Sequence, residues 1–314
     1  MNADKIISAL TPSELAVYKL RALFSERGYA QYKMSKFEEY ELYMRNKDFL
    51  VSDNIITFTD EGGKLMALKP DVTLSIIKNC APVIKTGCAK LCYNENVYRP
   101  QRGAQGFKEI MQVGLECVGE VGDAEIAEVI YLADRSLAEF SDSYALEISN
   151  LDVLSELFLA FGASADAKRK ITHELGLKNK DGILSAAEAD GISASDAELI
   201  ASLADIYGEP KSAIARLDKF RINESLCGVI DGFCSLIERL SALGVGDNLF
   251  VDFSVVGNMK YYNGIAIKGY IDKIPASVLS GGQYDNLMSR MKIKSRGMGF
   301  AVYLDELERL PQNI

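Results

Sequence analysis

The segment KLCYNENVYRPQRGAQGFKEIMQVGLECVG, residues 90–119, decides the fold, because it predicts two strands joined by a basic hairpin loop. We expect the first strand over residues 91–98, ending before Pro100, because proline cannot donate a hydrogen bond to a sheet ladder. We expect the second strand over residues 110–118. Its residues alternate, so one face carries Gln112, Gly114 and Glu116, and the other carries Val113, Leu115 and Cys117.

The loop and the polar face of the second strand each have two interpretations. Arg99, Arg102 and Lys108, spaced by Gly103 and Gly106, form a composition that lets backbone approach a phosphate while guanidinium groups pair with its oxygens. A solvated hairpin loop explains the same residues. Gln112 and Glu116, if buried, need a polar ligand or ordered water and would form the floor of a small-molecule site. The alternative is an antiparallel strand with one face in solvent.

Composition limits the classes of protein. A chain of 314 residues with 48% hydrophobic residues can bury one large domain and a smaller lobe. It has no apolar run of bilayer length and no signal-peptide pattern, so we expect a cytoplasmic protein without a membrane partner. The net charge of -9 argues against a broad nucleic-acid surface. The single histidine, His173, argues against a histidine-based metal site or a Ser-His-Asp triad, so we expect no metal.

The segments before the hairpin predict a helix, a strand and a second hairpin. Residues 11–14, TPSE, form a capping box with proline at the first helical position, and residues 28–38 predict a strand. Residues 60–63, DEGG, predict a turn between strands. Asp71 and Thr73, two residues apart near a helix start, would suit an ammonium group. Asp71 is equally well explained as a charge at a helix N-terminus.

After the hairpin the pattern changes twice. Residues 123–140 predict an amphipathic helix and residues 144–148 a strand, and a helical pattern with turns such as Lys180-Asp181-Gly182 follows. Strands resume at residues 248–256, 262–270, 277–280 and 297–303. We therefore expect one sheet built from both ends of the chain. The predicted division is a core of residues 1–149 and 245–314, interrupted by a mostly helical insertion of residues 150–244.

Four segments, in order, resemble class II aminoacyl-tRNA synthetases of the histidyl type. YNENVYRPQRG with QVGLECVG resembles motif 2, and residues 297–310 resemble motif 3. Met259-Lys260-Tyr261-Tyr262-Asn263-Gly264 resembles a signature peculiar to the histidyl enzymes, and Gly281-Gly282-Gln283-Tyr284-Asp285 resembles the family's GGRYD. The resemblance implies an α+β fold with a class II synthetase-like antiparallel sheet flanked by helices. Residues 28–38 resemble motif 1, the dimer segment, but lack its proline.

The resemblance also implies a histidine-binding site. The residues that stand where the family recognises histidine are Asp71, Thr73, Gln112, Glu116, Tyr262 and Tyr284. Among them, Gln112 and Glu116 would meet the ammonium and a ring nitrogen, and the tyrosines would enclose the imidazole. One departure lies close by, because Gln283 replaces the arginine of GGRYD.

The other departures fall where the family handles ATP. Arg99 keeps the motif 2 arginine, but Gln101 replaces the acidic residue two places later. Gly257 stands at the position of the catalytic arginine, and Glu306 at that of the motif 3 arginine. Amino-acid activation depends mostly on electrostatic stabilisation of a multiply negative transition state. We therefore expect no synthetase activity and no catalytic residue.

The sequence also ends directly after the motif 3 segment, so we expect no anticodon-binding domain and no tRNA partner. Together these features resemble the regulatory subunits of short-form ATP phosphoribosyltransferase. That resemblance implies a non-catalytic subunit that activates a separate catalytic subunit and mediates histidine feedback in the first step of histidine biosynthesis. The implied partners are this catalytic subunit and L-histidine, with a homodimer inside a hetero-oligomer and no cofactor. Arg99 and Arg102 would contact the partner or an anion.

Two other functions stay open. A histidyl-tRNA synthetase paralogue that activates an amino acid with ATP would show histidine-dependent exchange of pyrophosphate into ATP. A structural scaffold would bind no ligand.

Overall fold

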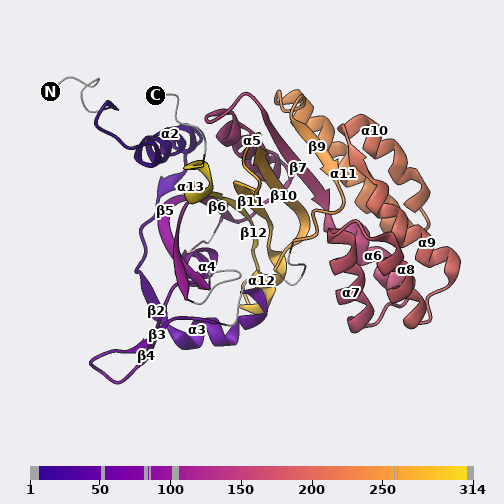
Figure 1. Cartoon of the computed structure of the whole chain (residues 1–314), viewed down its shortest axis with the longest axis horizontal. Helices are drawn as coiled ribbons and strands as arrows, with labels where there is room; N and C mark the ends of the chain where they lie inside the picture. The colour runs from indigo at the N-terminus through magenta and orange to yellow at the C-terminus, as the bar shows by residue number, and fades with distance from the viewer. Residues whose placement is uncertain are drawn as a thin grey trace.

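A nine-stranded sheet forms the centre of the part of the chain that the computed structural model describes, which is residues 7–50, 54–80, 84, 86–100, 106–257, 259 and 261–309 (Figure 1). Neighbouring strands are antiparallel except for two parallel pairs, β1 with β5 and β7 with β9. The sheet is flanked by helices in the α+β architecture that the sequence predicts, although these two strand pairs are parallel and not antiparallel. In spatial order its strands are β1 (Ala30–Gln31), β5 (Cys88–Pro100), β6 (Phe107–Gly119), β12 (Arg296–Tyr303), β11 (Leu279–Gln283), β10 (Asn263–Ile271), β7 (Tyr144–Asn150), β9 (Leu249–Asp252) and β8 (Tyr207–Gly208).

The β5–β6 hairpin is longer than expected. Its pairing runs from Cys88 opposite Gly119 to Pro100 opposite Phe107, so the prediction that the first strand ends before Pro100 is wrong. Pro100 occupies the last paired position, where its missing N–H removes one ladder bond at most. The predicted alternation along β6 is confirmed. Its apolar face enters the main core through Val113, Leu115 and Cys117.

Two long helices cover the apolar face of the sheet. Helix α2 (Pro12–Glu26) begins with the predicted capping box at Thr11, and α5 (Asp123–Ala138) packs against strands β7, β10 and β12. Leu20 and Phe24 of α2 are fully buried, and the Phe24 ring meets Phe300 edge to face with centroids 5.8 Å apart. Each such side chain contributes about 1.5–3 kcal/mol through burial alone. The main hydrophobic core therefore lies between these helices and the sheet.

A second, smaller sheet lies beyond the opposite face, with the order β2 (Phe37–Glu39), β4 (Leu65–Leu68) and β3 (Thr57–Thr59). The predicted hairpin at residues 60–63 is confirmed, because Thr59 pairs with Leu65 and Gly63 takes φ of +80°. The single strand expected over residues 28–38 is wrong, because β1 and β2 belong to different sheets. A second core joins this sheet to α3 (Tyr40–Arg45), η1 (Lys47–Phe49), α4 (Thr73–Cys80) and α12 (Asp285–Arg290).

Helices fill the chain between β7 and β9 and gather at one end of the molecule (Figure 1). Their apolar side chains continue the main core. The predicted turn at Lys180-Asp181-Gly182 is wrong, because these residues form the first turn of a helix whose N-cap, Asn179, accepts a hydrogen bond from the Gly182 N–H at 3.2 Å. These elements are α6 (Leu151–Ala160), α7 (Ala165–Gly176), α8 (Lys180–Ala189), α9 (Ala194–Ala201), η3 (Ser202–Asp205), α10 (Pro210–Ala215), η4 (Arg216–Phe220) and α11 (Glu224–Ala242).

Among the described residues, no helix has both the length and the apolar character that crossing a membrane requires. The described chain ends with a short helix, α13 (Leu304–Leu307), directly after β12.

Candidate functional site

A cavity of about 50 Å³ lies where β5, β6, β11 and β12 face the loop that precedes α4. The six residues predicted to bind histidine all line it, together with Arg99. Arg102, the second predicted arginine, lies outside the described residues, as does Gln101. The residues that line the cavity and that the sequence did not single out are Val72, Tyr93, Tyr261, Ser280, Gly299, Phe300, Ala301 and Tyr303.

Glu116 lies at the floor of the cavity and is almost completely buried. The Thr73 hydroxyl donates to one carboxylate oxygen at 2.6 Å, and the Tyr284 hydroxyl donates to the other at 2.6 Å. Burial raises the pKa of Glu116 to about 8, and these two hydrogen bonds only partly oppose that rise. At neutral pH the floor of the cavity is therefore mostly a neutral acid, which can donate a hydrogen bond to a basic ligand atom as well as accept hydrogen bonds.

Asp71 and Arg99 form the charged part of the cavity wall. Arg99 Nη2 lies 3.9 Å from Asp71 Oδ2, and Arg99 Nε donates to the Pro70 carbonyl oxygen at 2.8 Å. Asp71 Oδ1 also accepts from the Leu74 N–H at 2.9 Å, so Asp71 caps α4 as the sequence predicts and also lines the cavity. Burial raises the pKa of Asp71, while the Arg99 guanidinium opposes that rise. The interpretation of Arg99 as a solvated loop residue is wrong, since its side chain is only 16% exposed.

Two polar groups in the wall lack a protein partner. Gln112 is 3% exposed and Tyr93 is 4% exposed, and both line the cavity. Neither the Gln112 carboxamide nor the Tyr93 hydroxyl is hydrogen-bonded to another side chain or backbone group within the described ranges. The solvated-face interpretation of β6 is therefore wrong. Both groups line the cavity, so a polar ligand or ordered water there can satisfy them.

Three tyrosine rings close one side. The Tyr261 ring lies 4.7 Å from that of Tyr262 and 6.2 Å from that of Tyr284, both in edge-to-face geometry. The Ser280 and Tyr303 hydroxyls, which also line the cavity, are 2.6 Å apart. The sequence analysis missed Tyr303, which pairs directly with Gln112 across β12 and β6. The strand register that brings these two residues together is unknown from sequence alone.

The cavity matches the chemistry of a small zwitterion with a planar polar group. It offers one carboxylate, one guanidinium, a neutral acid and several hydroxyls. A volume of about 50 Å³ holds only three to five waters at the roughly 10–15 Å³ that each requires. A ligand the size of an amino acid therefore requires wall side chains, Arg99 among them, to move.

A protein-family model described as histidyl-tRNA synthetase matches residues 9–307 of the sequence. The chain belongs to the histidyl-tRNA synthetase family. The match spans the sheet, the cavity and the helices between β7 and β9.

Curated relatives of this chain carry a more specific name than the family model does. A protein from Clostridium botulinum (strain 657 / Type Ba4), named ATP phosphoribosyltransferase regulatory subunit, is 25% identical over 310 residues, which cover 92% of this chain and 70% of the relative. One from Oceanobacillus iheyensis with the same name is 26% identical over 297 residues, covering 93% of this chain and 72% of the relative.

Solved structures support the fold. An ATP phosphoribosyltransferase regulatory subunit/histidyl-tRNA synthetase from Bacillus halodurans C superposes with a TM-score of 0.84 at 23% identity, covering 95% of this chain and 79% of that one. A chain of the ATP phosphoribosyl transferase (HisG:HisZ) complex from Thermotoga maritima gives a TM-score of 0.72 at 17% identity, covering 94% and 98%.

Gln283, where the histidyl-tRNA synthetase family resemblance implies arginine, has a structural task outside the cavity wall. Its side-chain oxygen accepts a hydrogen bond from the Ile265 N–H at 2.7 Å, at the irregular step between β10 and β11. Gly264, which takes φ of +58°, gives the carboxamide its space, because a Cβ there would lie 2.3 Å from Gln283 Oε1. Arginine has no acceptor and could not make this bond.

The two positions where the family resemblance implies arginines that contact ATP are occupied by Gly257 and Glu306, so neither position supplies a cation. Gly257 takes φ of +52°, and a Cβ there would lie 3.2 Å from Cδ2 of Tyr262. Glu306 places its carboxylate 3.0 Å from the Arg309 guanidinium. Neither residue lines the cavity.

Proposed function

We propose that this chain is a non-catalytic regulatory subunit of a short-form ATP phosphoribosyltransferase and that it binds L-histidine in the cavity around Glu116. In this function it activates a separate catalytic subunit in the cytoplasm and passes histidine feedback to it in the first step of histidine biosynthesis. The names of its curated relatives support the regulatory part. The family supports the histidine part.

One observation carries the histidine assignment: Gln112 is a buried carboxamide with no protein partner in the described chain, on the floor it shares with Glu116. A histidine ligand would satisfy it. In the proposed pose the ammonium lies near Asp71, the carboxylate near Arg99 and the imidazole near Glu116. The neutral Glu116 donates to an unprotonated ring nitrogen, and the three tyrosines enclose the ring.

We infer that the chain does no adenylation chemistry of its own. Activation of an amino acid requires cations that stabilise the developing phosphate charge. Gly257 supplies none, and Glu306 supplies a carboxylate that Arg309 already pairs. The catalytic partner would instead bind ATP, phosphoribosyl pyrophosphate and magnesium.

The assembly and the division of the chain are also part of the proposal. The complex described for the Thermotoga maritima structure supports a hetero-oligomer with the catalytic subunit. We propose that this chain forms a homodimer in it and binds no tRNA. We propose the core as residues 1–149 and 245–314, with residues 150–244 as the mostly helical insertion.

Calorimetric titration of the purified chain with L-histidine tests the site. We expect saturable binding that Gln112→Leu weakens about tenfold or more, because a hydrogen bond to the ligand is lost and an apolar group faces it. Gln31→Leu makes the same chemical change on exposed β1, outside the cavity, and should leave the affinity unchanged. If the unmodified chain binds no histidine, the sensor assignment is wrong.

Reconstitution with the catalytic subunit tests the regulatory part. The chain should raise the rate of the phosphoribosyl transfer, and histidine should inhibit the reconstituted complex. Inhibition that persists unchanged with Gln112→Leu would place the feedback site elsewhere.

A further inference from the structure

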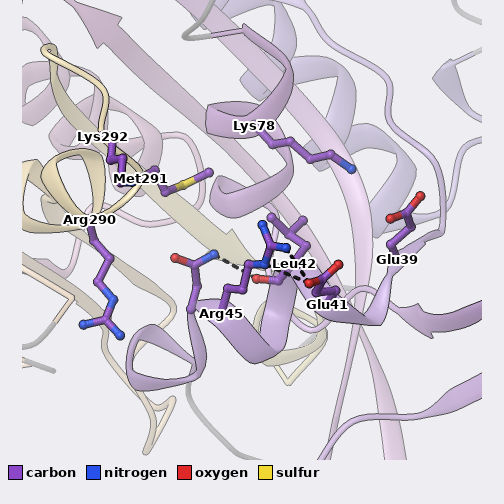
Figure 2. A pocket seen from close by; sticks show the side chains of 9 residues that line it. Glu39, Glu41, Leu42, Arg45, Lys78, Arg290, Met291 and Lys292 are labelled. Carbon is purple, nitrogen blue, oxygen red and sulfur yellow. Dashed lines mark hydrogen bonds and ion pairs between the residues drawn. The ribbon is translucent and has the colours of Figure 1, made fainter.

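A second hollow, of about 560 Å³, opens beside helices that belong to the second core (Figure 2). The end of β2, helix α3, the last turn of α4 and the end of α12 surround it. It is lined by Glu39, Glu41, Leu42, Arg45, Asn46, Lys78, Arg290, Met291 and Lys292. Its volume lies within the range of about 300–1,000 Å³ that small-molecule sites occupy.

The hollow is positively charged in a negatively charged protein. Four cations and two carboxylates line it, which gives a net charge of +2, whereas the whole chain carries -9. The convergence has a physical cause. Arg45, Lys78 and Arg290 each lie in the last turn of a helix, where a cation is favoured by the helix dipole, and three such helix ends meet here.

Both lining carboxylates are already paired. Glu41 accepts from Arg45 at 2.5 Å, and Glu39 lies 2.9 Å from Lys64 at the start of β4. They therefore repel an incoming anion less than free carboxylates would.

Two of the cations are available at low cost. Arg290 lies 3.6 Å from Asp48 with side chains 52% and 39% exposed, and an ion pair at such exposure contributes about 0–1 kcal/mol, so a ligand can replace it. Lys78 lies 2.7 Å from Glu38, whose side chain is only 11% exposed, so Lys78 adds charge to the hollow while it stays paired. Lys292 makes no ion pair with any residue in the described ranges.

We propose that this hollow binds a small anion with two linked phosphate groups. Guanidinium groups favour phosphate because their planar N–H donors match its oxygens in pairs. Figure 2 shows Arg290 and Lys292 on one side of the hollow, Lys78 across from them and Arg45 between. The cations stand on separate helices, and a diphosphate offers them two phosphate groups where orthophosphate offers one.

The hollow is separate from the first cavity but joined to it by two helices. Helix α4 begins with Thr73 in the cavity and carries Lys78 near its other end. Helix α12 follows Tyr284 of the cavity and ends with Arg290. The binding of an anion to one end of these helices does not require the first cavity to bind histidine, so the two proposals stand independently.

Titration of the intact chain with inorganic pyrophosphate, compared with orthophosphate, tests the proposal. We expect saturable binding of pyrophosphate, tighter than that of orthophosphate and weaker at higher ionic strength. The double variant Arg45→Gln/Arg290→Gln should weaken it about tenfold or more, because two charge-assisted contacts are lost. Both residues are exposed, so the fold should survive.

The matched control is Lys170→Gln/Lys211→Gln, which removes the same charge from exposed positions on α7 and α10. It should leave pyrophosphate binding unchanged. The proposal is wrong if pyrophosphate shows no saturable binding to the chain, or if both double variants lose the same affinity for pyrophosphate. In either case the cations only stabilise the ends of the helices that carry them. The proposal is also wrong if pyrophosphate fails to bind while Arg45→Gln/Arg290→Gln prevents assembly with the catalytic subunit, because the hollow is then a protein contact.

Discussion

The buried carboxyl of Glu116 should make the stability of this protein fall as pH rises. Its ordinary pKa is 4.5, and burial raises it to about 8 in the folded chain. Between these values the folded form holds a proton that the unfolded form has lost, so the free energy of unfolding decreases with increasing pH. The effect is absent well below pH 4.5 and complete above about pH 8.

The magnitude follows from the difference between the two pKa values. At about 1.36 kcal/mol per pH unit, the separation corresponds to a cost of roughly 5 kcal/mol above pH 8, of which roughly 3.5 kcal/mol develops between pH 5 and pH 8. Glu116→Gln stays neutral and removes this dependence. Glutamine has one acceptor oxygen where glutamate has two, so either the Thr73 or the Tyr284 hydroxyl loses its acceptor in the variant. This loss lowers the free energy of unfolding by about 1 kcal/mol.

The variant should therefore match the parent protein near pH 5 and exceed its stability by roughly 3 kcal/mol at pH 8. Denaturant unfolding at pH 5, 6, 7 and 8 measures both chains. Other buried carboxyls with raised pKa that do not interact with Glu116, Asp134 among them, contribute to the slope of both chains and cancel in the difference. Asp71 interacts with Glu116, so its contribution belongs to the difference. Glu61→Gln, at the exposed β3–β4 turn, is the control and should run parallel to the parent. A constant difference between parent and Glu116→Gln across this range would refute the reasoning.

Two further substitutions test the supports of the site by denaturant unfolding. Gln283→Arg should destabilise the protein by about 1–3 kcal/mol, because the Ile265 N–H loses its acceptor, and unchanged stability would contradict this role. Lys69→Met should cost about 3–5 kcal/mol, because it leaves Glu95, only 14% exposed, without the ammonium that now lies 2.5 Å away. Lys64→Met instead removes the partner of Glu39, whose side chain is 51% exposed, and should cost at most about 1 kcal/mol, so equal losses for the two lysines would be the contrary result.

Local patterns in the sequence were sufficient where the structure depends on neighbouring residues. The capping box at Thr11 involves two side chains three residues apart, and the turn at residues 60–63 is closed by its own aspartate and glycines. The alternation along β6 was equally readable, because side chains of a strand point to opposite faces in turn. It correctly separated Gln112 and Glu116 from the core residues between them.

Features that depend on distant partners were not predictable in the same way. Pro100 stays in β5 because Phe107 pairs with it, and residues 28–38 divide because the two short strands find partners in different sheets. The role of Gln283 depends on a backbone N–H 18 residues away. Tyr93 and Ser280 entered the cavity wall through strand register, which a single sequence does not reveal.

The arrangement of contacts also explains why one part of the site can change while another stays. Glu116 is held by Thr73, 43 residues away, and by Tyr284, 168 residues away, so replacing any of the three leaves buried polar groups unpaired in separate segments. Gly257 and Glu306 lie under no such constraint. Their nearest relevant neighbours are Tyr262, five positions along the chain, and Arg309, three positions along it. Substitutions at the arginine positions of the family therefore disturb only local structure, whereas the pocket around Glu116 can be lost only at a cost to the fold itself.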